Sequence, residues 1–499
     1  MNYVLAHDLG TSGNKVTLFD ENGAMVREVK MRYPTHYYNF NWAEQNADDW
    51  WGAVCQGTRQ VLQEIAPYRV AAVSFSAHMM GCLCVDRDGN PLRPSIIWCD
   101  QRAQQEFRQL RDALGEDKIF QTTGHRGSAN NSLPKLMWVK NNEPEVYAKT
   151  FQTLQCKEYI IFKLTGQFVT EPTDGVGTLA MDIVRRTWSE EMIAASGIER
   201  EKFPPVLKST AVAGHVTREA AQATGLAEGT PVVMGGGDGI AAAIGSGAIR
   251  LGETFMSFGS SAWVSTVAAS PMFDAGRRNQ NWPHIVEGLY LSDGVMQSAG
   301  GSYGWARQAL ASAGENAESD TDAEIERLAA AAPPGANGVL FLPYLLGERS
   351  PWWNPDAKGA FLGIQMGTTK GDLLRAVMEG VAHNMAYIAD MLRENGLPLR
   401  DVTIIGGGAR GALWRQILAD AMDARLHVPA TLEGATSLGA AITGGVGVGL
   451  FDSLETATER FISIRETHQP KRENTALYRR RRELFVKCYK ALEPLFAEF

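Results

Sequence analysis

The chain has 499 residues, and its 48 Lys+Arg against 56 Asp+Glu give a net charge of -8. This length predicts two or three domains with ample core, and a content of 44% hydrophobic and 21% charged residues is typical of soluble globular proteins. The acidic balance argues against a general nucleic-acid or anionic-membrane surface.

Targeting and redox signals are sparse. The N-terminus, MNYVLAHDLG, has neither a basic region nor a long apolar run, so we expect no signal peptide and a cytoplasmic location. The six cysteines are scattered, which favours a reduced compartment over a disulfide framework, and Cys82 and Cys84 are expected in the core rather than in a metal site. The uncharged residues 434–451 are rich in small side chains, which indicates a closely packed internal helix rather than a membrane span.

Residues 3–20 predict a β-hairpin with a polar, glycine-rich turn. The turn and its flanks contain Asp8, Gly10, Thr11, Ser12, Gly13 and Lys15. Backbone amides, hydroxyls and a cation within so few residues suit phosphate oxygens. Asp8 stands just before the turn, where it can hold a Mg²⁺ that bridges the phosphates. The alternative is a solvent-facing turn with a structural aspartate.

Mixed strands and helices follow. Helices are predicted at 47–63, 134–142 and 156–165, and strands at 70–76 and 95–98, with a polar loop at 173–178. The loop after the first of these strands contains His78, Met79 and Met80. Asp100 and Arg102, after the second, are placed either to fix a polar substrate or to form a salt bridge with each other.

The segment 231–240, PVVMGGGDGI, combines a short buried strand, three glycines and the single carboxylate of Asp238. Residues without Cβ allow a ligand or another backbone to approach closely. A carboxylate at the end of such a strand lies where open α/β sheets bind ligands, which suggests a general base at the floor of a cleft. The alternative is that Asp238 caps the helix beginning near Ile240.

The hairpin pattern returns half a chain length later. Residues 254–268 read as strand, Gly259-Ser260-Ser261, strand. We interpret this as an internal duplication, in which two related α/β domains each offer a phosphate-sized turn to a shared cleft. Chance similarity of two short hairpins is the alternative, and the position of PVVMGGGD directly before the second copy argues against it.

The second half continues with a long irregular segment, GERSPWWNPDAKGAFLGI, of a length that is usually functional. A helix is expected from Thr369 to Asn395, opened by a capping box of Thr369 and Asp372. The strand 402–405 leads into a glycine turn suited to a flat ligand, or simply to a tight turn. A C-terminal helix over 474–496 has an apolar stripe and a run of four arginines that we assign to its solvated face. The stripe consists of Leu477, Leu484, Phe485, Cys488 and Leu492.

Taken together, these stretches resemble the FGGY family of carbohydrate kinases, in its xylulokinase-like branch, over nearly the whole chain. The family's C-terminal signature matches from Gly359-Ala-Phe-Leu-Gly363 through Asp372 to Glu379. Its N-terminal signature, centred on Lys135-Leu-Met-Trp-Val139, matches except that Asn130 occupies its first position. The segment LPYLLGERSPWWNPDAKG and the C-terminal Tyr478-Arg-Arg-Arg-Arg are also xylulokinase-like.

The resemblance implies two actin-like, ribonuclease-H-like α/β domains, residues 1–248 and 249–499, facing each other across an ATP/sugar cleft. It implies a sugar kinase in which Asp8 serves Mg²⁺–ATP and Asp238 is the base. The implied phosphate- and adenosine-binding residues are Gly10, Thr11, Ser12, Lys15, Gly259, Ser260, Ser261, Gly300, Gly407, Gly408 and Ala409. The expected ligands are ATP, Mg²⁺ and a small sugar, with no nucleic acid or membrane partner, and a homodimer stays open.

The substrate pocket departs from the family's pattern. Xylulokinases usually have Gln-Met-His-Gly where this chain has His78-Met79-Met80-Gly81, and Trp-Asn-Asp where it has Trp98-Cys99-Asp100. We expect His78, Met79, Met80, Asp100, Arg102 and Asp238 to contact the sugar. A pentulose such as xylulose is the first expectation, and another pentulose, a deoxy sugar, a polyol or a sugar acid stays open.

Two other classes are weighed against a kinase. A non-catalytic sugar sensor on the same fold predicts the loss of Asp8 or Asp238, and both are present. An actin- or chaperone-like ATPase predicts an added peptide-binding or polymerising domain, and the kinase-like stretches leave no spare segment for one. A sugar kinase is therefore the prediction.

Overall fold

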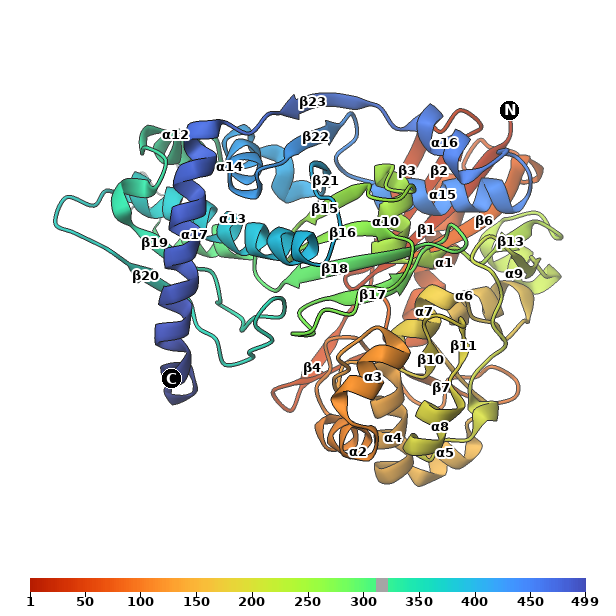
Figure 1. Cartoon of the computed structure of the whole chain (residues 1–499). Helices are drawn as coiled ribbons and strands as arrows, with labels where there is room; N and C mark the ends of the chain where they lie inside the picture. Colours follow the sequence, from red (N-terminus) through yellow and green to blue (C-terminus); the bar gives the residue numbers. More distant parts are fainter. Residues whose placement is uncertain (311–321) are drawn as a thin grey trace.

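Two seven-stranded mixed sheets form the framework of the chain, one within residues 3–237 and the other within residues 254–468 (Figure 1). They are seen in a computed structural model that describes residues 1–310 and 322–499. Helices lie around both sheets (Figure 1).

The first sheet has the strand order β12-β13-β6-β1-β2-β3, with β14 also paired to β6. Its strands are β1 Tyr3–Gly10, β2 Gly13–Asp20, β3 Met25–Arg32, β6 Val70–Ala77, β12 Val212–His215, β13 Pro231–Val233 and β14 Gly236–Gly237. Strands β1, β2 and β3 form an antiparallel meander, and β6 adds to the other edge of β1 in parallel. Strands β13 and β14 continue in parallel beside β6, so their carboxyl ends lie at the same edge.

The second sheet has the order β17-β18-β16-β15-β21-β22-β23. Its strands from β23 back to β18 correspond to β12-β13-β6-β1-β2-β3 of the first sheet, and β17 is an additional edge strand. Its strands are β15 Thr254–Phe258, β16 Ala262–Ala268, β17 Gln280–Pro283, β18 Tyr290–Met296, β21 Asp401–Ile405, β22 Arg425–Pro429 and β23 Ile464–His468. Again three strands form a meander, and two more add in parallel beside the first of them. The same strand order in both halves supports the internal duplication that the two hairpins predict.

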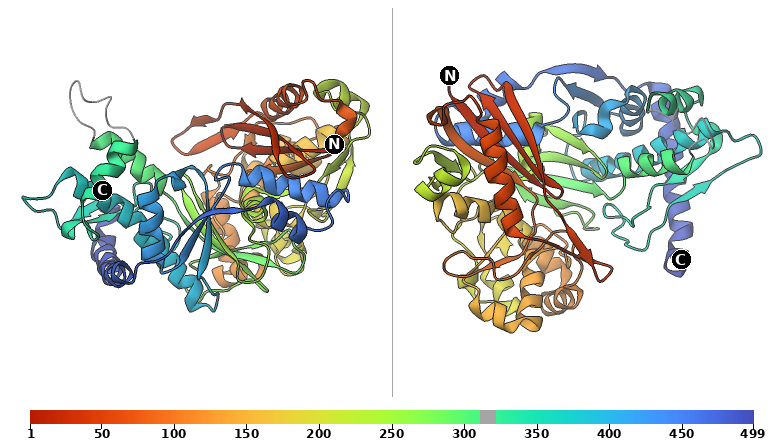
Figure 2. Two further views of the ribbon diagram at one scale, coloured as in Figure 1. Left: turned by 90° about the horizontal axis from the view of Figure 1, so that it is seen from above. Right: turned by 180° about the vertical axis from the view of Figure 1, so that it is seen from behind.

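Helices α10 (Asp238–Ser246) and α15 (Ala435–Gly447) join the two sheets. Helix α15 follows a strand of the second sheet but packs on β6 and β1 of the first (Figure 2, left). A Cβ on Gly439 would lie 1.8 Å from the carbonyl oxygen of Ala241, and one on Gly245 would lie 1.8 Å from that of Ala435. The two backbones therefore touch, which explains the small residues of the segment 434–451.

The other helices surround this centre. In the first half they are α1 Ala47–Val61, α2 Gln104–Leu114, α3 Glu116–Thr123, α4 Ser132–Asn142, α5 Pro144–Lys149, α6 Cys156–Thr165, α7 Pro172–Gly177, α8 Glu190–Ser196 and α9 Arg218–Thr224. In the second half they are α11 Gly300–Ala309, α12 Asp322–Ala331, α13 Lys370–Glu394, α14 Ala412–Met422, α16 Leu454–Phe461 and α17 Arg472–Leu492. Helices α2 to α5, with α8, form a lobe beside the first sheet (Figure 1).

Short strands between these elements form one three-stranded sheet and three strand pairs. They are β4 His36–Tyr38, β5 Trp42–Gln45 and β8 Ser95–Ile96 in one small sheet, with the pairs β7 Leu83–Val85 and β9 Gln152–Leu154, β10 Met181–Asp182 and β11 Thr187–Trp188, and β19 Leu340–Leu342 and β20 Ala360–Leu362. The predicted capping box of Thr369 and Asp372 opens α13.

Four expectations are corrected. The segment GERSPWWNPDAKGAFLGI is not irregular throughout, because Ala360–Leu362 form β20, which pairs with β19. Residues 173–178 are not a loop, because Glu171 accepts hydrogen bonds from the amides of Thr173 and Asp174 and so opens helix α7. The strand expected at 95–98 ends at Ile96. The buried stripe of the C-terminal helix is Thr475, Tyr478, Phe485 and Tyr489, whereas Leu484 is 45% exposed. The predicted stripe gave too much weight to aliphatic side chains, and the two tyrosines lie in the core instead.

All six cysteines lie within the described residues and are free thiols. In the described part of the chain, no helix is long and apolar enough to cross a membrane.

Candidate active site

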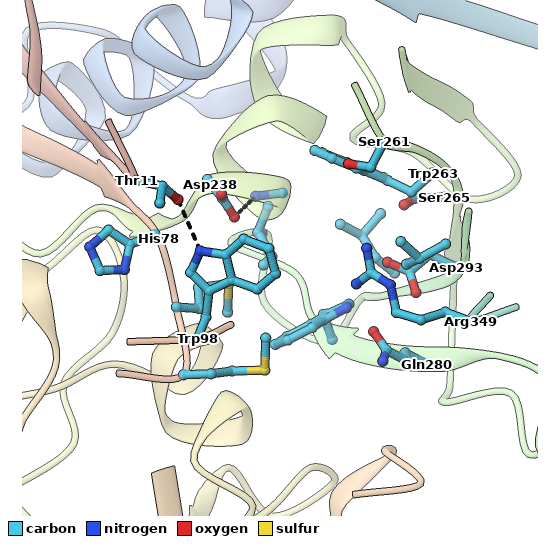
Figure 3. A pocket seen from close by; sticks show the side chains of 17 residues that line it. Thr11, His78, Trp98, Asp238, Ser261, Trp263, Ser265, Gln280, Asp293 and Arg349 are labelled. Carbon is cyan, nitrogen blue, oxygen red and sulfur yellow. Dashed lines mark hydrogen bonds between the residues drawn. The ribbon is translucent and has the colours of Figure 1, made fainter. Parts of the chain in front are cut away.

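A cavity of about 200 Å³ lies between the two halves of the chain. The first half contributes Thr11, His78, Met79, Met80, Trp98 and Asp238, and the second contributes Ser261, Trp263, Ser265, Gln280, Trp282, Asp293 and Arg349 (Figure 3). The cavity thus brings together Asp238 and one hydroxyl residue from each predicted phosphate hairpin, Thr11 and Ser261.

Asp238 is the first residue of α10, directly after β14. Gly237 occupies the N-cap position, and the Asp238 side chain accepts a hydrogen bond of 2.7 Å from the amide of Gly239 instead of capping the helix. The preceding glycines are required by space, since a Cβ on Gly235 would lie 2.0 Å from the carbonyl oxygen of Phe75. Burial, followed by the charge of Asp8, raises the pKa of Asp238 to about 7. Such a carboxyl exchanges its proton near neutral pH.

The first hairpin turn is held in place by side chains from other elements. Tyr33 donates a hydrogen bond of 2.5 Å to the carbonyl oxygen of Gly10. Gln45 donates one of 2.7 Å to that of Thr11, and Trp98 donates its indole hydrogen to the Thr11 hydroxyl at 2.9 Å (Figure 3). The turn is therefore rigidly placed at the edge of the cavity.

Asp8 lies on β1 behind this turn. Its carboxylate accepts a hydrogen bond of 3.0 Å from Ser76 and lies 3.6 Å from the ammonium of Lys15. Burial raises the pKa of Asp8, and Lys15 and Ser76 oppose this shift. No group of three His, Cys, Asp or Glu side chains that could hold a metal by itself occurs in the described residues. Asp8 fits Mg²⁺ in another way, because this ion is usually held by one or two carboxylates together with substrate phosphates and water.

The second hairpin turn meets the start of α11. The amides of Gly300 and Gly301 donate hydrogen bonds of 3.0 Å to the carbonyl oxygens of Gly259 and Ser260. The glycine turn after β21 lies against the end of β15, because a Cβ on Gly408 would lie 2.9 Å from the carbonyl oxygen of Phe258. The structure therefore gathers the residues predicted for the second phosphate loop and for adenosine, including Gly407 and Ala409, in one region.

His78 and Met80 line the cavity from the loop after β6. His78 is buried and neither of its ring nitrogens has a hydrogen-bond partner among the described residues. Burial lowers the pKa of His78 to about 4, so the ring is neutral and offers one donor and one acceptor. Met80 has a positive φ of 64°, and buried Lys135 supports it with a hydrogen bond of 2.8 Å to its carbonyl oxygen.

Asp100 and Arg102 do not line the cavity. They pair with each other at 2.8 Å, and both side chains are almost fully buried. Arg102 also pairs with Glu44 at 2.8 Å and lies over the ring of Trp42. The structure thus supports the salt-bridge alternative, in which the two residues brace the loops behind the pocket.

The cavity is also lined by residues of the second half that are not among those predicted from the sequence, chiefly Trp263, Gln280, Asp293 and Arg349. Asp293 is 6% exposed, and burial raises its pKa to about 7 against the opposing charge of Arg349. A signal was present in the strand YLSDGVM, where Asp293 is the single carboxylate and alternates with the apolar Leu291 and Val295 on one face.

Sequence and structure comparisons agree with this arrangement. The models of the FGGY family of carbohydrate kinases match in both parts, the N-terminal domain over residues 3–245 and the C-terminal domain over residues 254–448. Two facing sheets of this topology around a cavity with two hairpin turns define an actin-like carbohydrate kinase fold. The chain belongs to the FGGY family of carbohydrate kinases.

Individual relatives cover nearly the full chain. A xylulose kinase of Bacillus subtilis is 32% identical over 495 residues, covering 98% of this chain and 97% of that protein. A gluconokinase of Bacillus licheniformis is 31% identical over 502 residues, covering 99% and 97%. The structure of a ligand-bound xylulose kinase from Lactobacillus acidophilus superposes with a TM-score of 0.93 at 27% identity, and all of both chains is covered. This chain is therefore a carbohydrate kinase, and its relatives act on more than one substrate.

Proposed function

We propose that the protein transfers the γ-phosphate of ATP to a hydroxyl of a pentulose-type sugar, with Asp238 as the general base. The observation that carries the proposal is the position of Asp238 in a cavity bordered by both hairpin turns, with a pKa of about 7. A carboxylate with this pKa can accept the proton of an attacking hydroxyl under neutral conditions.

The rest of the reaction is positioning and charge neutralisation. The amides and hydroxyls of the two turns, with Thr11 and Ser261 nearest the cavity, would bind phosphate oxygens. Asp8 would help hold Mg²⁺, and the bound ion would neutralise charge on the phosphates. His78 would donate to or accept from the sugar, and Trp98 and Trp263 would pack against it and exclude water.

We further propose that residues 1–248 and 249–499 act as two domains that close on the sugar. Because the cavity takes its lining from both halves, closure would complete the site and keep water from the γ-phosphate.

A sugar acid is the second candidate substrate, because gluconokinases and xylulose kinases match this chain at nearly equal identity. A coupled assay of ADP release with D-xylulose, D-ribulose, pentitols, a deoxy sugar and D-gluconate separates the two. A pentulose with the highest kcat/KM supports the proposal, and ATP turnover that no sugar or sugar acid stimulates would overturn it.

Two variants test the assigned roles. Asp238→Asn should lower kcat about 10²–10⁴-fold, because the shape is kept but the proton acceptor is lost.

Asp8→Ala should raise the concentration of Mg²⁺–ATP that the enzyme needs for half-maximal rate. The affinity for the sugar, measured by calorimetry, should stay nearly unchanged. Full turnover by Asp238→Asn, or a loss of sugar affinity with normal nucleotide use in Asp8→Ala, would contradict the assignments.

A further inference from the structure

Three adjacent strands of the second sheet, β16, β18 and β17, form one wall of the cavity. Side chains alternate between the two faces of a strand, so every second residue can face the same space. On β18 the alternate residues Leu291, Asp293 and Val295 all line the cavity, and Trp263 and Ser265 of β16 do the same. The cavity therefore lies against a continuous face of the sheet.

The register places the polar residues of this wall in a single row. Asp293 is paired with Ser265 on one side and with Gln280 on the other. The neighbouring rows are apolar, since Trp263 pairs with Val295 and Trp282 pairs with Leu291. A polar row between aromatic and aliphatic rows suits a polyhydroxy molecule, whose hydroxyl groups and C–H faces alternate in the same way.

The centre of the row has unused hydrogen-bonding capacity. The side chains of Trp282 and Ser265 lie close enough to Asp293 to act as hydrogen-bond donors and, against the effect of burial, hold its pKa down. Among the described residues, Oδ1 of Asp293 and Nε of Arg349 are nevertheless buried without a hydrogen-bond partner. Figure 3 shows Arg349 beside Asp293 at the edge of the cavity. An acceptor and a donor that are buried without partners cost free energy unless a ligand satisfies them. This pair is therefore available to the substrate.

The charges of the cavity lining disfavour an anionic substrate. In the described part of the chain, its charged side chains are the carboxylates Asp238 and Asp293 and the guanidinium of Arg349. The neighbouring Glu348 accepts a hydrogen bond of 2.8 Å from the Arg349 amide, and burial raises the pKa of Glu348 to about 8, so it does not neutralise Arg349 fully at neutral pH. A sugar carboxylate would add a further anion in a space with little water to screen it.

We infer that the row Gln280–Asp293–Ser265, together with Arg349, binds hydroxyl groups of the substrate from the second half and selects neutral polyhydroxy sugars over sugar acids. Asp293 accepts a hydrogen bond from one hydroxyl at its unpartnered Oδ1, and Arg349 donates from its unpartnered Nε to a neighbouring oxygen. The inference rests on the proposed kinase activity and narrows its substrate class.

The experiment compares neutral sugars with D-gluconate at pH 8, above the pKa of about 7 of both cavity carboxylates. The wild type should prefer its best neutral sugar by about tenfold or more in kcat/KM. In Asp293→Asn the KM of that sugar should rise about tenfold to hundredfold with a smaller change in kcat, because a buried charged acceptor is lost. The kcat/KM for gluconate should not fall in this variant, so the preference for the neutral sugar over gluconate becomes smaller.

Two further variants guard against a purely structural effect. Gln280→Ala removes the other end of the row and should raise the same KM by a smaller factor. Asp274→Asn changes a buried carboxylate of the same half that pairs with Arg278 and does not line the cavity, so the ratio of neutral to acidic substrates should stay at the wild-type value.

The outcomes separate this inference from the proposed function. An unchanged KM in Asp293→Asn, or an equal loss on neutral and acidic substrates, overturns the inference while the kinase activity stands. A wild-type enzyme that prefers gluconate also overturns the inference, and shows that the substrate is a sugar acid. A wild type that phosphorylates nothing in the panel overturns the proposed function itself.

Discussion

At the scale of single residues, Asp238 shows how burial shapes reactivity. Its pKa is raised to about 7 by burial and by the charge of Asp8. We expect kcat/KM to rise with pH and level off above about 7, as the base loses its proton. A rate profile from pH 5 to 9 checks this, with the coupling enzymes in excess. A plateau that already begins near pH 5 would contradict it.

The same shift affects stability. The folded chain holds the Asp238 proton up to about pH 7, whereas the unfolded chain loses it near the ordinary aspartate value. This contribution to stability is present at low pH and is lost as the pH rises through 7. Asp238→Asn should therefore have a higher Tm than the wild type at pH 8, and the difference should shrink at pH 5. An Asn variant that is less stable at pH 8 would contradict the assigned shift.

The side chain of Met80 is expected to influence which sugar the cavity accepts. It lines the cavity where xylulokinases keep a histidine, and its sulfur is at best a weak acceptor. A hydroxyl left unpaired there costs roughly 1–3 kcal/mol, about tenfold to hundredfold in affinity. We expect Met80→His to improve D-xylulose relative to the best wild-type substrate, and His tolerates the positive φ of this position better than most residues. A wild type that already prefers D-xylulose with a micromolar KM would show that Met80 only packs.

At the scale of elements, helix α7 supports the loop that carries Asp238. Buried Lys157 pairs with Glu171 at 2.7 Å, and Thr173 donates its hydroxyl hydrogen to the same carboxylate. The Thr173 oxygen in turn accepts a hydrogen bond of 2.8 Å from the amide of Gly237, the residue before Asp238. A buried ion pair is thus connected to the base through one hydroxyl group.

Thr173→Val keeps the size of this side chain and removes the acceptor. We expect kcat to fall about tenfold to hundredfold with little change in sugar KM, because the Gly237 amide is left unpaired and Asp238 is less well placed. Thr224→Val is the matched control, since it loses a hydroxyl that bonds Ala220 of α9 away from the cavity. Equal losses of kcat in the two variants would show that α7 has no special role.

At the scale of the whole molecule, the contact of α10 with α15 couples the two sheets. Any side chain at Gly439 would meet the carbonyl oxygen of Ala241, so Gly439→Val should destabilise the fold by about 1–3 kcal/mol or more. Gly52→Ala in α1 is the control, because nothing lies within 4 Å of its added Cβ and alanine favours helix. Thermal unfolding should show a lower Tm for the first variant and an unchanged or higher Tm for the second. A wild-type Tm for Gly439→Val would refute the close crossing.

The proposed closure of the two halves also belongs to the scale of the whole molecule. Arg277 of the second half pairs with Glu116 of α3 in the first half at 2.7 Å. We expect small-angle scattering to give a smaller radius of gyration when the correct sugar is bound, because the cavity is lined from both sides. A sugar that is not phosphorylated serves as the control. An unchanged radius at saturating substrate would count against closure.

The sequence by itself determined the features that depend on neighbouring residues. The two hairpins, the glycine turn before Asp238, the capping box at Thr369 and the close-packed helix at 434–451 all follow from local composition, and the structure has each of them. Local patterns suffice there because turns, caps and small-residue contacts are decided by the backbone freedom and side-chain size of a few adjacent residues.

Only the tertiary structure decided which of these residues meet. Asp293, Gln280 and Ser265 form a row through strand register, and Arg349 joins them from a distant loop. Asp100 and Arg102, although adjacent to the pocket in sequence, turn away from it into a buried pair. The physical reason is that a charged side chain finds its partner through burial and packing across the whole fold, which the spacing of residues along the chain does not specify.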